Sequence, residues 1–192
     1  MDDSCMIDKI TVFNQALAQL GDREYIVDTP AARAVNLWWP SVLREAVSFA
    51  PWSWATKRME VAGDVAVIEL PPDCLKVLGV GADVFRVVGR TVYVELAGHR
   101  LTKEGNIWLD YLSDAWAIGE VLPEFSPFFV RGVVLLLAGR CALKLAGSAE
   151  LAQGLEQQGY AWLRRAATDD AQQYESNDQD PLVGWMEGGY WV

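Results

Sequence analysis

Residues 126–147, SPFFVRGVVLLLAGRCALKLAG, decide the fold more than any other stretch of the chain. Ser126 and Pro127 are typical of a helix start, because serine caps the first turn and proline fits the first helical position. Apolar residues then cover nearly every side of the expected helix until Gly147, which is expected to end it. A helix that is apolar all round is buried on several sides. The stretch therefore predicts the centre of a helical bundle, with helix bounds of about 126–146.

Apolar residues at helical spacing predict three more helices around this centre. Their approximate bounds are 6–21, 30–56 and 149–173. Thr29 followed by Pro30 predicts the start of the second helix, and Ser148 that of the last. The expected apolar stripe of the second helix includes Trp38. Pro40 lies inside this helix, where it removes a backbone donor, so we expect a kink or a restart there.

Short runs rich in β-branched residues predict a β-region at about 63–113. The predicted strands are 65–70, 76–80, 84–88, 91–96 and 107–112. Gly89-Arg90 separates two of them and suits a type II′ hairpin, because glycine comes first. Such short connections favour antiparallel pairing. The expected fold is therefore α+β but mainly α: a helical bundle with a small inserted antiparallel β-region and an extended C-terminal arm.

The composition changes after residue 175, so we predict a domain at 1–175 and a docking arm at 176–192. The arm contains a polar run and several glycines, yet it also carries large apolar residues that isolated tails usually lack. These residues are the candidate interface for docking on another protein surface: Trp185, Met186, Tyr190, Trp191 and Val192. The alternative is that the tail folds back on its own domain.

The net charge of −10 excludes several classes of function. Such an acidic chain gains little from the counterion release that drives nucleic-acid binding, and it is not attracted to anionic membranes. No apolar run is long enough to span a bilayer, and the N-terminus lacks the basic region of a signal peptide. Three widely spaced cysteines indicate free thiols. We expect a soluble protein that is cytosolic where it is made.

The sequence offers no convincing catalytic, metal or cofactor residues. His99 is the single histidine, without a ligand cluster beside it. Cys74 follows Asp73, whose charge raises a thiol pKa instead of activating the thiol. Gly79-Val80-Gly81 lacks the third glycine and the helix that a nucleotide-binding turn needs. We expect no enzyme activity.

Charged groups elsewhere also have simple interpretations. Lys57-Arg58 follows Trp52 and Trp54 and superficially resembles a nucleic-acid patch, although packing explains the tryptophans better. Asp169-Asp170 fits a solvated helix end. The remaining carboxylates considered for a glycosidase-like pair are Glu69, Asp83, Glu95 and Asp110, whose spacing does not favour one.

Several segments, in order, resemble the head-to-tail adaptor (connector) family of tailed bacteriophages, of the tail tubular protein A type. The similar segments are 14–21 (NQALAQLG), 43–58 with APWSWATKR at its centre, 70–78 (LPPDCLKVL), the hairpin 85–93, 108–111 (WLDY) and the helices at 125–171. The match spans almost the whole domain, and the order is more specific than any one piece. The aromatic ending of the chain departs from the family pattern.

The resemblance implies a structural virion protein of the neck or tail. It implies a homo-oligomeric ring of twelve copies that meets the portal protein on one side and the tail nozzle or tail-tube protein on the other. DNA would pass through the channel without specific binding, and the family has no catalytic residues to transfer. Two other hypotheses stay open: a cytosolic helical protein-binding module that docks through the aromatic tail, and a virion-borne wall hydrolase using a carboxylate such as Glu69 or Asp110.

Overall fold

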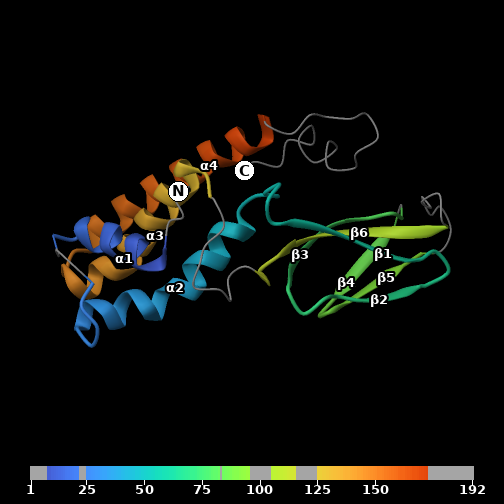
Figure 1. Cartoon of the computed structure of the whole chain (residues 1–192), viewed down its shortest axis with the longest axis horizontal. Helices are drawn as coiled ribbons and strands as arrows, with labels where there is room; N and C mark the ends of the chain where they lie inside the picture. The colour runs from blue at the N-terminus through green and yellow to red at the C-terminus, as the bar shows by residue number, and fades with distance from the viewer. Residues whose placement is uncertain (1–7, 22–24, 83, 96–104, 116–124, 173–192) are drawn as a thin grey trace, which may run out of the picture. The chain divides into compact units, whose positions relative to one another are not determined.

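The structure, a computed structural model, describes residues 8–21, 25–82, 84–95, 105–115 and 125–172. The chain divides into two compact units, one formed by Met1–Ala50 and Ala115–Ala171 and the other mainly by Pro51–Asp114. Among the described residues, the first unit holds the helices and the second holds the strands (Figure 1). The predicted boundary between a domain and an arm at 175–176 lies outside the described residues.

The helical unit contains α1 (Lys9–Ala18), α2 (Pro30–Ser48), α3 (Pro127–Leu145) and α4 (Ala149–Gln172). The predicted caps are confirmed, since Thr29 accepts from the Ala32 amide at 3.1 Å, Ser126 from the Phe129 amide at 3.2 Å and Ser148 from the Leu151 amide at 3.1 Å. Gly147 has the positive φ of +65° that suits the residue after a helix. Side-chain caps thus fix where three of these helices begin.

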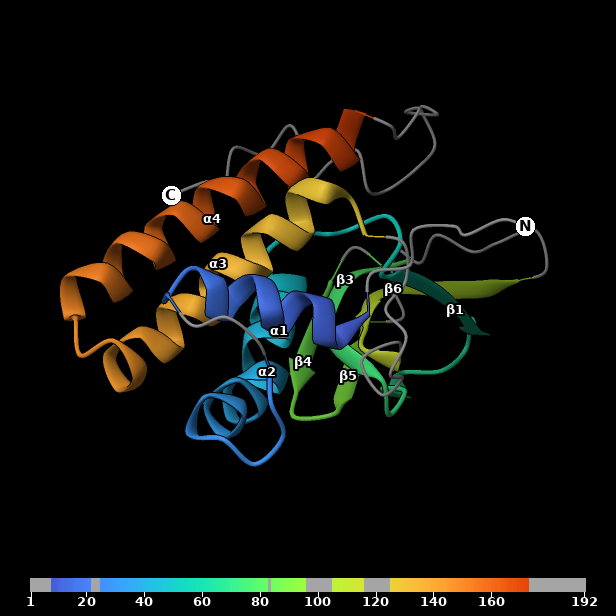
Figure 2. The same cartoon turned by 60° about the vertical axis from the view of Figure 1, so that its left-hand side comes forward.

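The helix α3 is buried on nearly every side, as predicted from its sequence. It contacts α1 and α2, and it lies beside α4 in both views (Figures 1 and 2). Glycines allow the approach to α4: a Cβ on Gly132 would lie 2.7 Å from a Leu163 methyl carbon, and one on Gly159 would lie 2.8 Å from Cγ of Leu136. The helices α3 and α4 therefore approach each other more closely than they could with larger residues at positions 132 and 159.

The helix α2 continues through Pro40, so the expected restart is absent, while the expected kink stays a prediction. The predicted apolar stripe of α2 is wrong at one position. Trp39, not Trp38, is buried, because it lies four residues after Val35 and three before Val42 on the side that faces the helical core. Trp38 stays 38% exposed, so α2 presents a tryptophan outside the core.

The strand unit contains two antiparallel sheets of three strands each. The first has the order β1 (Thr56–Ala62), β6 (Asn106–Ser113), β3 (Cys74–Val80), and the second has the order β2 (Val67–Glu69), β5 (Thr91–Val94), β4 (Phe85–Val88). The five predicted strands and their antiparallel pairing are confirmed. Gly89 has φ +60° and Arg90 has no positive φ, which fits the expected type II′ hairpin between β4 and β5.

One apolar core joins the two sheets. Its buried residues come from alternate positions of both sheets: Ile68, Val80, Ala82, Val92, Val94, Ile107, Leu109 and Tyr111. Because the second sheet packs its Ile68–Val92–Val94 face into this core, its opposite face and its outer strands remain at the surface.

The prediction of a mainly helical bundle with a small β-insertion is wrong. The fold is α+β with four helices and two three-stranded sheets among the described residues, about half of which are helical. The physical reason is β1, which the sequence analysis did not identify as a strand. Paired with β6 along its whole length, it completes a sheet large enough to share a core with the second one.

Within the part of the chain that the structure describes, no helix combines the length and apolarity that a bilayer crossing requires.

Candidate interaction surfaces

The candidate interface residues predicted from the sequence lie outside the described residues. They are Trp185, Met186, Tyr190, Trp191 and Val192, all in the C-terminal stretch 173–192. His99, Asp83 and Cys5 also lie outside them. The structure therefore places none of these residues, and the candidate surfaces come from the two described units.

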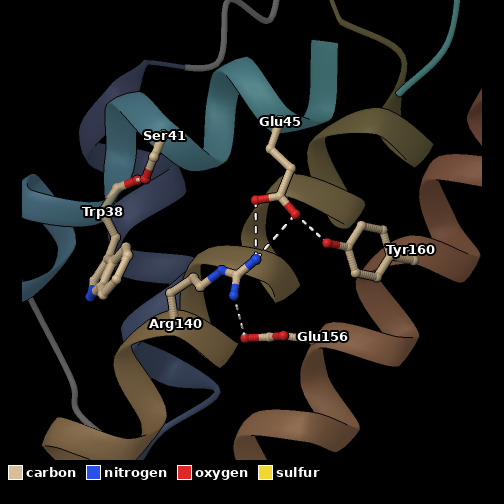
Figure 3. Close-up of polar contacts among 6 residues, drawn as sticks. All are labelled: Trp38, Ser41, Glu45, Arg140, Glu156 and Tyr160. Atoms are coloured by element: carbon tan, nitrogen blue, oxygen red, sulfur yellow. Dashed lines mark hydrogen bonds and ion pairs between the residues drawn. The ribbon is translucent and has the colours of Figure 1, made fainter. Parts of the chain in front are cut away.

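A polar cluster joins three helices of the helical unit (Figure 3). Arg140 on α3 donates from Nη2 to both carboxylate oxygens of Glu45 on α2, at 3.1 Å each. Its Nη1 lies 3.3 Å from Oε1 of Glu156 on α4. Tyr160, one turn further along α4, donates its hydroxyl to Glu45 and stacks on Phe49 with 6.2 Å between ring centroids. A single guanidinium thus connects carboxylates from two other helices.

The surroundings of this cluster raise the pKa of Arg140 and that of Tyr160. Burial lowers the pKa of Arg140, but Glu45 and Glu156 more than offset that effect and raise it above its usual value. Burial, followed by the hydrogen bond to Glu45 and the charge of that carboxylate, raises the pKa of Tyr160 to about 12. The arrangement suits a brace between helices, because Arg140 stays cationic and Tyr160 stays a hydrogen-bond donor.

The two basic residues of the predicted aromatic-basic patch both have carboxylate partners. Lys57 Nζ lies 2.8 Å from Oδ2 of Asp73, which also accepts from Ser113 at 2.5 Å. Arg58 binds Asp110 in a bidentate manner, with Nε to Oδ1 at 2.7 Å and Nη2 to Oδ2 at 2.8 Å. The positive charges of β1 are therefore balanced within the sheet, which weakens the nucleic-acid interpretation.

The tryptophans beside this pair serve packing, as expected. Trp52 is fully buried and stacks against Trp54 with 6.0 Å between ring centroids. A third tryptophan, Trp108 on β6, carries the Arg58 guanidinium over its ring at 5.2 Å. The same ring lies 3.3 Å from where a Cβ on Gly79 would stand, so this glycine leaves room for an indole and not for a nucleotide.

The other sequence candidates have structural surroundings of their own. Cys74 begins β3, where burial raises the pKa of its thiol, Arg90 lowers it and Asp73 raises it, with a net increase. The thiol stays protonated at neutral pH, in agreement with a packing role. After Gly81 the next element is the strand β4 and not a helix, in agreement with rejecting a nucleotide-binding turn. Asp169-Asp170 lie in the last turn of α4.

A surface that the sequence analysis missed surrounds β4, the outer strand of the second sheet. Exposed large apolar side chains gather on this small sheet: Val67, Val84, Phe85, Val87, Val88 and Tyr93. All four residues of β4 are exposed, on both faces of the strand. A sequence signal for this exposed strand was available in the adjacent apolar residues Val87 and Val88. A strand that covers one core with one face alternates apolar and polar residues instead.

No protein-family model matches the chain, and no curated protein sequence has significant similarity to it. No group of three or more His, Cys, Asp or Glu side chains in the described ranges could hold a metal ion. The assignment of a function therefore depends on the order of the sequence motifs and on the surfaces just described.

Proposed function

We propose that the protein is a head-to-tail adaptor of a tailed bacteriophage, a structural virion protein that forms a ring between the portal and the tail. The observation that carries this proposal is the order of the segments that resemble the adaptor family. The segments fall on successive elements: 14–21 on α1 and its end, 43–58 on the end of α2 and the start of β1, 70–78 on the entry to β3, 85–93 on the β4–β5 hairpin, 108–111 on β6 and 125–171 on α3 and α4.

The cross-braced helices suit a part that must hold its shape under load. Glu45, Arg140 and Glu156 connect α2, α3 and α4, and the glycines of α3 and α4 bring these two helices close together. A ring that transmits force between two larger assemblies needs such stiff subunits. The helical unit is therefore a reasonable framework for the adaptor.

The charge balance suits a wall along which DNA moves without being held. The chain carries a net charge of −10. Lys57, Arg58 and Arg140 are paired with carboxylates, and Arg165 lies over the rings of Phe128 and Trp162 at 4.5 and 5.6 Å. Copies arranged around a channel would present a mainly negative surface that repels phosphate groups.

The direct test is to mix the purified protein with the portal protein encoded nearest to it and to image the mixture by electron microscopy. We expect rings of this protein stacked on the portal, with the same rotational symmetry as the portal. The free protein can be monomeric, so the portal alone and the protein alone are imaged as controls. The absence of a stable complex at micromolar concentrations would contradict the proposal.

A second measurement separates an adaptor from a DNA-binding protein. In a filter-binding assay at low salt, double-stranded DNA should not be retained by the protein or by its complex with the portal. Salt-dependent retention, with affinity falling as the salt concentration rises, would show phosphate contacts that the proposal does not allow.

A further inference from the structure

Among the described residues, the strand β4 pairs on one side only, with β5, and its other edge offers backbone hydrogen bonds. The Glu95 amide donates to the Val84 carbonyl at 3.1 Å, and the Val94 amide donates to Ala66 on the opposite side at 2.9 Å. Because hydrogen-bonded and non-hydrogen-bonded pairs alternate in an antiparallel ladder, Phe85 and Val87 direct their N–H and C=O groups away from β5. No described strand pairs with that side of β4.

The side chains of this edge are apolar on both faces of the sheet. Phe85 and Val87 lie on the core face, opposite Val94 and Val92, yet they are 37% and 42% exposed. Val88 lies on the other face and is 51% exposed. Exposed edge strands without protection pair readily with another extended chain. A strand that covered this edge would need apolar side chains on both of its faces.

A segment of this kind lies near the C-terminal end of the sequence. Residues 182–187, LVGWME, are apolar at consecutive positions and carry one charge, Glu187. The last twenty residues, 173–192, contain four acidic residues and no basic one. Residues 83–95 around β4 carry two basic residues, Arg86 and Arg90, within the hairpin and two acids, Asp83 and Glu95, at its ends. The segment and the edge are therefore complementary in charge as well as in apolar pattern.

The length of the chain after α4 permits this contact between copies. The helix α4 ends at Gln172, and the twenty residues beyond it can span up to roughly 65 Å when extended. We propose that residues 182–187 of a neighbouring copy add to the free edge of β4 as a further strand, with Glu187 near Arg86. This inference rests on the proposed function, because the ring supplies the neighbouring copy.

Disulfide trapping between two differently tagged variants tests the contact. Both variants carry Cys5→Ser and Cys74→Ser and keep the buried Cys141; one adds Val87→Cys and the other Trp185→Cys. They are mixed, assembled on the portal and oxidised mildly. We expect a cross-linked pair that contains both tags. The matched control replaces Val87→Cys with Val67→Cys, which is 49% exposed on β2, the opposite edge of the same sheet, and should cross-link far less.

The outcomes separate this inference from the adaptor proposal. Rings on the portal without the link at position 87, or with equal links at positions 87 and 67, overturn the inference and leave the adaptor proposal intact. A third variant carries Val87→Cys and Trp185→Cys on the same chain. If this variant forms the link within one chain while the two mixed single variants do not, the inference is also overturned, because the segment then covers its own sheet. The absence of rings contradicts the adaptor proposal itself.

Reversing the charges of Arg86 and Glu187 gives a second test, in which the yield of the cross-link is measured. A misfolded variant would not regain this yield when its partner is changed. Arg86→Glu should lower the yield of the cross-link about two- to fivefold, the size expected for one cross-strand charge pair. Glu187→Arg in the partner variant should then restore the yield. Failure of the double reversal to restore it, with both proteins folded, would exclude the proposed pairing of these two residues.

Discussion

At the scale of single residues, Lys57 and Arg58 are neighbours whose ion pairs should differ in energetic weight. The side chain of Asp110 is 2% exposed and that of Arg58 is 45% exposed, whereas both partners of the Lys57–Asp73 pair are open to solvent. Arg58→Ala leaves a buried carboxylate without its bidentate partner, so we expect a loss of about 2–3 kcal/mol in the free energy of unfolding. Lys57→Ala should cost about 1 kcal/mol or less.

Urea denaturation of the two variants and the parent protein measures this difference. Equal losses would mean that the burial of Asp110 has no energetic consequence. The side chain of Arg58 is 45% exposed, so the expected loss is smaller than the roughly 3–5 kcal/mol typical of a fully buried pair.

Tyr160 should make the protein less stable as the solution becomes strongly alkaline. Burial and the Glu45 carboxylate raise its pKa to about 12, while an unfolded tyrosine has a pKa near 10. Between about pH 10 and 12 the folded state holds this proton and the unfolded state does not, so the free energy of unfolding falls as the pH rises. Tyr160→Phe should flatten this part of the curve.

The test compares the pH dependence of urea unfolding across that range, with Tyr93→Phe on the exposed face of β5 as the matched control. An unchanged slope in Tyr160→Phe would rule out the link between Tyr160 and Glu45. Below pH 10 the variant should show no change in slope, because the tyrosine is protonated in both states.

The residue-scale features differ in how far the sequence predicts them. Caps such as Thr29 and Ser126 are local, so a short pattern identifies them. Ion-pair partners are not local: Arg58 and Asp110 are 52 positions apart, and Glu45 and Arg140 are 95 apart. Periodicity identifies the face on which a residue lies but not the residue it will meet across the core.

At the scale of elements, the close approach of α3 and α4 predicts opposite effects for two glycines of α4. A Cβ on Gly159 would lie 2.8 Å from Cγ of Leu136 and 3.1 Å from the Gly132 carbonyl oxygen, whereas a Cβ on Gly154 would meet nothing within 4 Å. Gly159→Ala should lower the free energy of unfolding by about 1–3 kcal/mol through overpacking. Gly154→Ala should raise it by up to about 1 kcal/mol through helix propensity.

Thermal unfolding of the two variants gives the comparison directly, because both add one methyl group to the same helix. A stabilised Gly159→Ala variant would mean that α3 and α4 can move apart at little cost. The prediction concerns the approach of the two helices and does not depend on any partner.

The element that the sequence analysis missed, β1, shows why helix propensity misled it. Lys57, Arg58, Met59 and Glu60 all favour helices in isolation, and the sequence analysis predicts a helix to residue 56 with no strand at 56–62. Pro51 indicates that the helix ends before residue 56, because the residue before a proline avoids the helical region of backbone angles. Met59 and Val61 face the core only because β1 pairs with β6, a tertiary contact across about fifty residues.

At the scale of the whole molecule, the fold class depended on that single strand. Five strands were expected and antiparallel pairing was correct, but their division into two sheets with a shared core was not visible from periodicity. Adding β1 gives each sheet three strands, and its Met59 and Val61 pack against the core around Val92 and Leu109. The seven residues of β1 thus make the difference between the predicted small β-insertion and the observed pair of three-stranded sheets.

The last prediction concerns the C-terminal stretch and the whole assembly. Removing residues 180–192 should leave the melting temperature of the isolated protein nearly unchanged, because these residues are proposed to cover a neighbouring copy and not their own core. The same deletion should weaken assembly on the portal, since each subunit loses a contact and the ring multiplies that loss over all its copies. Differential scanning calorimetry measures the first effect and co-sedimentation with the portal the second. A large fall in melting temperature would instead show that the stretch belongs to the fold of its own chain, and the free edge of β4 would then need a different partner.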